Sequence, residues 1–464
     1  MKRTHVIPSS YPSAMHFLIA LFCLAALFVA DDLSRTVDPR TSLLGTLAGM
    51  LLVVFAAGWG TRTVCRRVRC EFPHHENALR SLARWKQGHA ALWSVFSAVN
   101  ILVLRWPAVV SKTWRLENAL WVDEILILAP LLLPLVGAWC WFYEVERTTE
   151  LVAAVKRGRA VRNARRRHYV LLHARVYFGL ILLPLFLMVT IRDVIDRVIN
   201  AGLLAAEQTY WIYGLGLFAM SWSVPQIMRL LWRTESLSAG PLRQRVFELA
   251  QVANVRVRDV LVWKTGHRIA NALVTGMLPW RRYVIISDGL LRALRPAEIE
   301  AIVLHEAAHL KHHHLLLRLC ALTLPLSMLV IAAEFWPQLA LQSLPTDLSL
   351  ATVPLALLAA GVLYVLICVA AYCRHMEHEA DLQAAQILNS EEPLCRALES
   401  LADAGGCSRD SRGWLHPSIA RRTAFLQGCA KDHAVARRFR YRTTVMQGVL
   451  LGISVAAPWI FVTS

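Results

Sequence analysis

The chain has 464 residues, of which 56% are hydrophobic, and its mean hydropathy is +0.44. Soluble domains carry less apolar sequence than this, so the composition argues against an ordinary soluble protein and indicates an integral membrane protein. The formal net charge is +18. In a membrane protein a basic excess is typical of cytoplasmic loops and of contact with anionic lipid, so we predict a lipid-bilayer partner and no nucleic acid.

Nine apolar runs are long enough to cross a bilayer core, which requires about 20 residues in a helix. They lie at 14–30, 41–59, 90–110, 122–143, 169–191, 209–228, 316–339, 351–373 and 443–462. The first run ends in FVADD, which is a poor cleavage site for a signal peptide, so we expect this run to remain as a span.

The charge of the loops predicts the orientation of these spans. The segments 62–86 and 156–167 are rich in Lys and Arg, which is typical of the cytoplasmic side. Alternation of the spans then places the N-terminus inside. Because the seventh and eighth runs form a hairpin, the segments 229–315 and 374–440 both emerge on the cytoplasmic face, where they can meet.

Three parts are predicted along the chain. Residues 1–228 form a membrane domain of about six helices, residues 229–440 form a domain interrupted by the transmembrane hairpin 316–373, and residues 441–464 form a last transmembrane helix. In the middle part, 255–263 and 281–287 read as strands, 271–280 reads as an irregular or edge strand, and a helix begins at Pro296. We therefore expect a multi-span helical membrane protein whose α+β domain is assembled from two cytoplasmic segments.

The segment HEAAHLKHHH, residues 305–314, contains the pattern HExxH. On a helix His305 and His309 lie on one face, at the separation that one tetrahedral Zn²⁺ requires, and Glu306 can reach a water beside the metal as a general base. A short pattern also arises by chance, in which case these histidines would belong to an amphipathic helix at a membrane surface.

A zinc hydrolase needs a third protein ligand. The spacing HExxHxxGxxH would require histidine at Leu315, so we expect His312, His313 and His314 at the surface, although His312 and His313 share a face with His309 and a secondary metal contact stays open. The alternative lies beyond the hairpin, where Glu377 and Asp381 are four residues apart on one helical face. A glutamate ligand followed by an aspartate that holds a ligand imidazole would complete the site.

Four blocks then occur in an order that resembles one family of zinc metallopeptidases. They are NALVTG at 271–276, SDGLLRALRPAEIEAIVLHEAAH at 287–309, RHMEHEAD at 374–381 and HPSIARR at 416–422. Together they resemble peptidase family M48, the gluzincin family of the CAAX prenyl endopeptidases and the HtpX heat-shock proteases. The resemblance covers roughly residues 229–430 and leaves the role of the first 228 residues open.

The resemblance implies a gluzincin-type zinc metalloprotease domain with one Zn²⁺ per chain, bound by His305, His309 and Glu377. Glu306 would accept the proton of the attacking water, and His416 would donate to the developing oxyanion. Asp381 would orient a ligand imidazole, with Arg422 in a buried ion pair near it. Asn271 and Ala272 would lie on an edge strand that pairs with the backbone of the substrate.

The sequence therefore predicts a membrane-embedded zinc endopeptidase whose active site is at the cytoplasmic face and whose substrate is a protein or peptide, including membrane proteins. Cleavage within the bilayer is disfavoured because Arg295, Glu298, Glu300 and Lys311 crowd the HExxH helix. Alternatives from other classes are a metal transporter, a non-catalytic zinc-binding scaffold, and a sensor that transmits a signal from the membrane half. Substrate and oligomeric state are not readable from the sequence.

Overall fold

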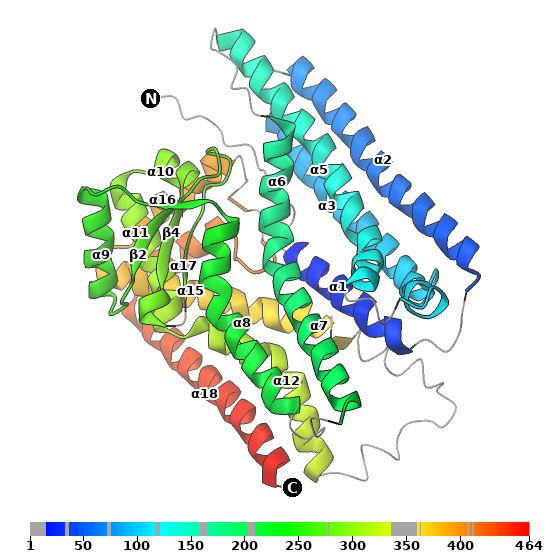
Figure 1. Cartoon of the computed structure of the whole chain (residues 1–464). Helices are drawn as coiled ribbons and strands as arrows, with labels where there is room; N and C mark the ends of the chain where they lie inside the picture. Colours follow the sequence, from blue (N-terminus) through cyan, green and yellow to red (C-terminus); the bar gives the residue numbers. More distant parts are fainter. Residues whose placement is uncertain are drawn as a thin grey trace. The chain divides into compact units, whose positions relative to one another are not determined.

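The computed structural model describes residues 15–32, 37–71, 76–116, 121–157, 165–202, 209–276, 278–335, 360–361, 363–405, 409–410 and 413–463. The chain folds as two compact units. Unit 1 consists of Met1–Glu235, Trp263–Ile269 and Ala404–Cys407, and unit 2 consists of Ser236–Val262, Ala270–Asp403 and Ser408–Ser464. Most of the described residues are helical (Figure 1).

Unit 1 is built from helices. In chain order they are α1 (Met15–Asp32), α2 (Pro39–Glu71), α3 (Glu76–Leu102), α4 (Trp106–Ala108), the π-helix η1 (Val109–Thr113), α5 (Val122–Arg157), α6 (Arg166–Tyr177), α7 (Gly179–Asn200) and α8 (Thr209–Leu231). The indole N–H of the buried Trp93 donates to the Leu131 carbonyl at 2.7 Å, and Asn100 donates to the Thr46 hydroxyl at 2.8 Å. Such bonds satisfy the polar groups inside an otherwise apolar helix cluster.

Several helices of unit 1 have the length and composition of membrane spans. Pro39–Glu71 and Val122–Val152 meet both requirements as single helices. Two further pairs meet them together but are bent, Ser81–Leu102 with Trp106–Thr113 by 45° and Arg166–Tyr177 with Gly179–Asn200 by 52°. At the first bend Arg105 has a left-handed backbone (φ 51°), which interrupts the helix. Among the described residues this gives two to four candidate spans, while parts of the predicted runs at 14–30, 316–339 and 351–373 lie outside them, so nine spans stay a prediction.

The sheet of unit 2 has the strand order β1-β2-β4-β3, with β1 at Thr234–Ser236, β2 at Asp259–Trp263, β3 at Ala272–Thr275 and β4 at Tyr283–Ser287. Strands β3 and β4 are antiparallel, with Ala272 opposite Ile286 and Thr275 opposite Tyr283. The predicted edge strand is therefore confirmed as β3. The strand is followed by Gly276 (φ 107°), where a Cβ atom would come within 2.3 Å of the Arg281 carbonyl oxygen.

The other elements of unit 2 are helices. They are α9 (Pro241–Val252), the 3-10 helix η3 (Pro279–Arg281), α10 (Asp288–Ala293), α11 (Pro296–Lys311), α12 (His314–Phe335), the π-helix η4 (Val365–Val369), α15 (Ala370–Leu388), α16 (Glu392–Gly405), α17 (Ile419–Lys431) and α18 (His433–Thr463). Helix α11 packs against α9, α15 and β3, and its residues Ile299, Val303 and Leu304 belong to the main core of the unit. This central helix carries HExxH.

The start of α11 is fixed by polar contacts. Pro296 occupies the first turn, where its missing N–H is no loss. The buried Glu298 carboxylate accepts the backbone N–H of Arg295 at 2.9 Å and the Ser400 hydroxyl at 3.2 Å. A carboxylate in the first turn also interacts favourably with the positive end of the helix dipole. These contacts fix the helix that positions the candidate site.

Candidate metal centre

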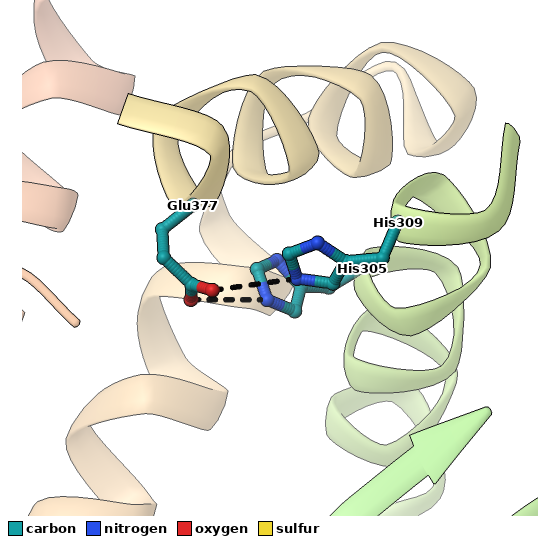
Figure 2. Close-up of side chains that lie close together, drawn as sticks. All are labelled: His305, His309 and Glu377. Carbon is teal, nitrogen blue, oxygen red and sulfur yellow. Dashed lines mark ion pairs between the residues drawn. The ribbon is translucent and has the colours of Figure 1, made fainter. Parts of the chain in front are cut away.

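Two helices bring the three predicted ligands together. His305 and His309 lie on neighbouring turns of α11, and Glu377 faces them from α15 (Figure 2). Nε2 of His305 lies 3.6 Å from Oε2 of Glu377, and Nε2 of His309 lies 3.4 Å from Oε1. One ligand atom from each of the three residues lies within 4.8 Å of the others. Residues 68 to 72 positions apart in sequence thus form one compact cluster.

The donor set and the spacing fit a zinc ion. Two imidazole nitrogens and one carboxylate oxygen are ligands that zinc prefers, and a tetrahedral ion with ligands at about 2.0–2.1 Å holds them roughly 3.3 Å apart. Glu377 is only 1% exposed, and its carboxylate lies among imidazole nitrogens, of which Nδ1 of His416 is 2.8 Å from Oε2. The guanidinium groups of Arg318 and Arg422 approach its oxygens to 3.6 and 3.8 Å. A buried carboxylate beside two further metal-ligand side chains is suited to a cation.

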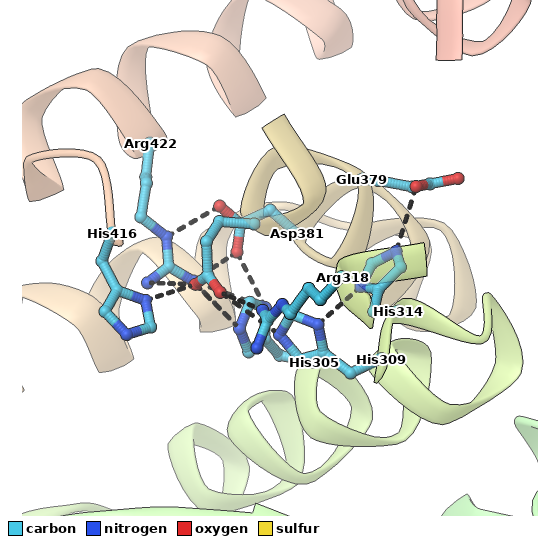
Figure 3. A network of polar contacts seen from close by, with 9 residues as sticks. His305, His309, His314, Arg318, Glu379, Asp381, His416 and Arg422 are labelled. Atoms are coloured by element: carbon cyan, nitrogen blue, oxygen red, sulfur yellow. Dashed lines mark hydrogen bonds and ion pairs between the residues drawn. The ribbon is translucent and has the colours of Figure 1, made fainter. Parts of the chain in front are cut away.

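Asp381 and Arg422 lie next to His305 (Figure 3). Oδ1 of Asp381 is 3.0 Å from His305 Nδ1, and the Arg422 guanidinium binds the same carboxylate through Nε at 2.8 Å and Nη2 at 2.5 Å. Burial acts to raise the pKa of Asp381, but Arg422 and His305 outweigh it and hold this pKa below its usual value. Burial and Arg422 act to lower the pKa of His305, but hydrogen bonds to Asp381 and Glu377 raise it to about 9. An ionised Asp381 therefore fixes the orientation of the imidazole.

His309 is supported by two residues that the sequence pattern does not identify. Nδ1 of His309 lies 2.6 Å from Nδ1 of His314, and Nε2 of His314 lies 3.0 Å from Oε2 of Glu379 (Figure 3). The expectation that His314 lies at the surface is wrong, because its side chain is 1% exposed. The chain turns at His313 (φ 52°) between α11 and α12, and this turn points His314 back toward His309.

Glu379 is itself held by several neighbours. Besides His314, its carboxylate accepts Nε2 of Gln447 at 2.9 Å and lies 3.2 Å from Nδ1 of His312. His312 is partly buried and His313 is exposed. Among the described residues neither His312 nor His313 contacts Glu377, so the two side chains lie outside the cluster of three. The sequence feature that could have indicated this arrangement is Glu379, the second glutamate of EHEAD at 377–381.

Glu306 lies one position beyond His305 and is partly exposed. Within the described part of the chain its carboxyl group forms no hydrogen bond or ion pair. Burial raises the pKa of this carboxyl to about 7, although the neighbouring His305 acts in the opposite direction. A carboxylate with a pKa near neutrality and no competing partner is suited to accept a proton from water.

The remaining predicted residues lie at different distances from the cluster. His416 precedes α17, is 57% exposed, and places Nδ1 2.8 Å from Oε2 of Glu377. Ala272 is buried at the start of β3, and Asn271 pairs its backbone with Ser287. No hydrogen bond or ion pair joins Asn271 or Ala272 to the cluster among the described residues.

The comparisons with known proteins agree with the sequence blocks. Residues 236–430 match the sequence profile of Peptidase family M48, so the predicted resemblance to this family is confirmed over that segment. A Protease HtpX homolog of Aeropyrum pernix is 29% identical over 181 residues, which cover 38% of this chain and 56% of that protein. The Protease HtpX homolog of Syntrophobacter fumaroxidans is 28% identical over 189 residues, which cover 39% of this chain and 66% of that protein.

This chain therefore spans less than two thirds of the length of these relatives. The crystal structure of S. mikatae Ste24p covers 85% of this chain and 100% of its own, with 15% sequence identity and a TM-score of 0.41. This score is too low to define a shared fold. What the comparisons show is that the segment that carries the His–His–Glu cluster resembles Peptidase family M48.

Proposed function

We propose that the protein is a membrane-embedded, zinc-dependent endopeptidase. The observation that carries this proposal is the buried cluster of His305, His309 and Glu377 next to the unpartnered carboxyl of Glu306, inside a segment that matches Peptidase family M48. A scaffold that only binds metal needs the three ligands but has no use for a proton acceptor beside them. The pair of features favours catalysis.

His305, His309 and Glu377 would hold one zinc ion per chain. Zinc in such a site acts as a Lewis acid that polarises the scissile carbonyl and lowers the pKa of a water molecule. Asp381, held by Arg422, orients the His305 ring through Nδ1, and His314, held by Glu379, does the same for His309. Fixed ring orientation keeps both Nε2 atoms directed at Glu377.

Glu306 would act as the general base. Its pKa near 7 allows it to accept a proton from the attacking water and later to return that proton to the leaving amine. His416, whose Nδ1 lies 2.8 Å from Oε2 of Glu377 and whose side chain is 57% exposed, would donate a hydrogen bond to the oxyanion of the tetrahedral intermediate. The scissile carbonyl of the substrate would lie between these two groups.

The substrate would bind as an extended peptide. Strand β3 lies at the edge of the described sheet and packs against α11, so its outer edge would pair with a peptide backbone beginning at Asn271 and Ala272. We assign the catalytic domain to the two segments 229–315 and 374–440 and place it at the cytoplasmic face, because the charged loops at 62–86 and 156–167 favour that side. Its substrates would be proteins or peptides, including membrane proteins.

Removal and return of the metal tests this proposal. The detergent-purified chain should lose cleavage of a broad peptide library when a strong chelator extracts zinc, and about one equivalent of zinc per chain should restore it. Full cleavage after complete zinc removal would contradict the proposal. Restoration should fail in His305→Ala and Glu377→Ala, which lack a ligand, and should succeed in His313→Asn, whose side chain is exposed.

A further inference from the structure

A cavity in unit 1 suggests a second site, and none of the residues that line it belongs to the histidine cluster. The cavity has a volume of about 230 Å³ and lies between α6, the end of α8 and the loop after β2. Four of its lining residues are cations, namely Arg175, Arg233, Lys264 and Arg268, and none of the described lining residues is acidic. A cavity that offers only positive charge is suited to an anion.

Two of these cations are already neutralised and two are not. Lys264 forms an ion pair with Glu235 at 3.0 Å, and Arg268 pairs with Glu146. Within the part of the chain that the structure describes, the side chains of Arg175 and Arg233 form no ion pair. Both arginines therefore line the cavity without an anionic partner among the described residues. A guanidinium group can bind phosphate through two parallel hydrogen bonds.

Two stacked tryptophans form part of the same wall. The rings of Trp232 and Trp263 have centroids 4.3 Å apart and are 7% and 3% exposed. Their indole N–H groups are buried, so these residues contribute a rigid apolar surface and the arginines contribute the donors.

The ligand must also match an apolar wall. Leu171, Leu172, Val176 and Leu231 line the cavity beside the cations. Helix α6 belongs to a bent helix pair that is long and apolar enough to span a membrane, so the cavity adjoins a candidate span. An anion that carries an apolar chain and is abundant at such a place is a membrane phospholipid. We propose that this cavity binds the phosphate headgroup of an anionic phospholipid.

Lipid binding to the full chain tests the proposal. Native mass spectrometry in a neutral detergent measures binding of phosphatidylglycerol and of phosphatidylcholine with the same acyl chains. The parent should prefer phosphatidylglycerol. Arg175→Gln and Arg233→Gln should weaken that binding about tenfold or more, because each removes charge-assisted hydrogen bonds.

Two controls separate the possible outcomes. Arg197→Gln changes an exposed arginine outside the cavity and should leave binding unchanged, and inorganic phosphate should compete with the lipid. If inorganic phosphate binds with the same sensitivity to the variants but phosphatidylglycerol does not, the phosphate site stands and the lipid source is wrong. If the cavity variants bind both probes as Arg197→Gln does, or the parent binds neither, the proposal is overturned.

Discussion

At the scale of single residues, the feature that most distinguishes the site is that each imidazole of the cluster has its own supporting residue. His305 is held by Asp381, and His309 is held by His314, which is held in turn by Glu379. Support of this kind fixes the ring and the tautomer of a ligand histidine, and losing it weakens metal binding without removing a ligand. The second support uses a histidine where the first uses a carboxylate.

His314→Ala should therefore weaken zinc binding by about 10- to 100-fold while all three ligands remain. His314→Asp should recover part of that loss, because a carboxylate at this position can still accept the Nδ1 proton of His309. Competition against a chromophoric chelator measures both affinities. His313→Asn is the matched control, since its side chain is exposed and asparagine tolerates the left-handed backbone there. Equal affinities in the alanine variant and the control would contradict this role for His314.

The sequence identifies one half of this arrangement better than the other. His305, Glu306 and His309 follow from helical spacing, and Glu377 with Asp381 from a second helix of the same kind. The contact between His309 and His314 crosses the break between α11 and α12, where the 3.6-residue period no longer applies. Burial of His314 depends on Glu379, which lies 65 residues away, so no local pattern predicts it.

At the scale of secondary-structure elements, the site depends on α11, which carries His305, Glu306 and His309. The first turn of α11 is stabilised by Glu298, whose carboxylate accepts hydrogen bonds from the N–H of Arg295 and the hydroxyl of Ser400 on α16. Because Glu298 is buried, its removal would leave both donors without their acceptor, and each such donor costs about 1–3 kcal/mol.

Glu298→Ala should accordingly lower the stability of unit 2 and increase amide hydrogen exchange along α11. Glu300→Ala is the matched control on the same helix, because it removes only a pair with the half-exposed Arg245, and surface pairs contribute about 0–1 kcal/mol. Hydrogen exchange followed by mass spectrometry measures both variants. Protection of α11 that falls equally in the two would refute the importance of this cap.

The strands illustrate what periodicity predicts and where it fails. The alternation at 255–263 predicts one long strand, but β2 begins only at Asp259. The residues before Asp259 do not all continue the strand, because the N–H of Val255 donates to the Ala250 carbonyl at the C-terminal end of α9. A helix end needs such partners for its last carbonyl groups, and this need shortens the strand. The irregular segment at 271–280 contains the edge strand β3, as its Gly and Pro indicate.

At the scale of the whole molecule, the central question is on which side of the membrane the two segments that form the cluster lie. Composition and helix length support a chain that crosses the bilayer, and the loop charges predict that 229–315 and 374–440 share the cytoplasmic side with the basic loop 62–86. Each of the two segments contributes ligands, so the cluster could not form if they lay on opposite sides.

Labelling of cysteines on intact vesicles tests this arrangement. In a background without other cysteines, we expect Cys70 of the basic segment 62–86, Ser238→Cys and Glu392→Cys to react with a membrane-impermeant maleimide in inverted vesicles. None of the three should react in vesicles that enclose the cytoplasmic side. All three positions are exposed or lie in exposed segments. A position that reacts in the opposite kind of vesicle from Cys70 would contradict the shared cytoplasmic face.

The comparison of Glu306→Gln with Glu300→Gln tests the central claim most directly, because both changes are isosteric and lie on α11. Zinc content and peptide cleavage are measured on the same detergent-purified samples. We predict about one zinc per chain in the parent and both variants, with cleavage reduced by about 10²- to 10⁴-fold only in Glu306→Gln, since general-base catalysis contributes factors of that size. Parental cleavage by Glu306→Gln, or a parent that holds no zinc, would contradict the account.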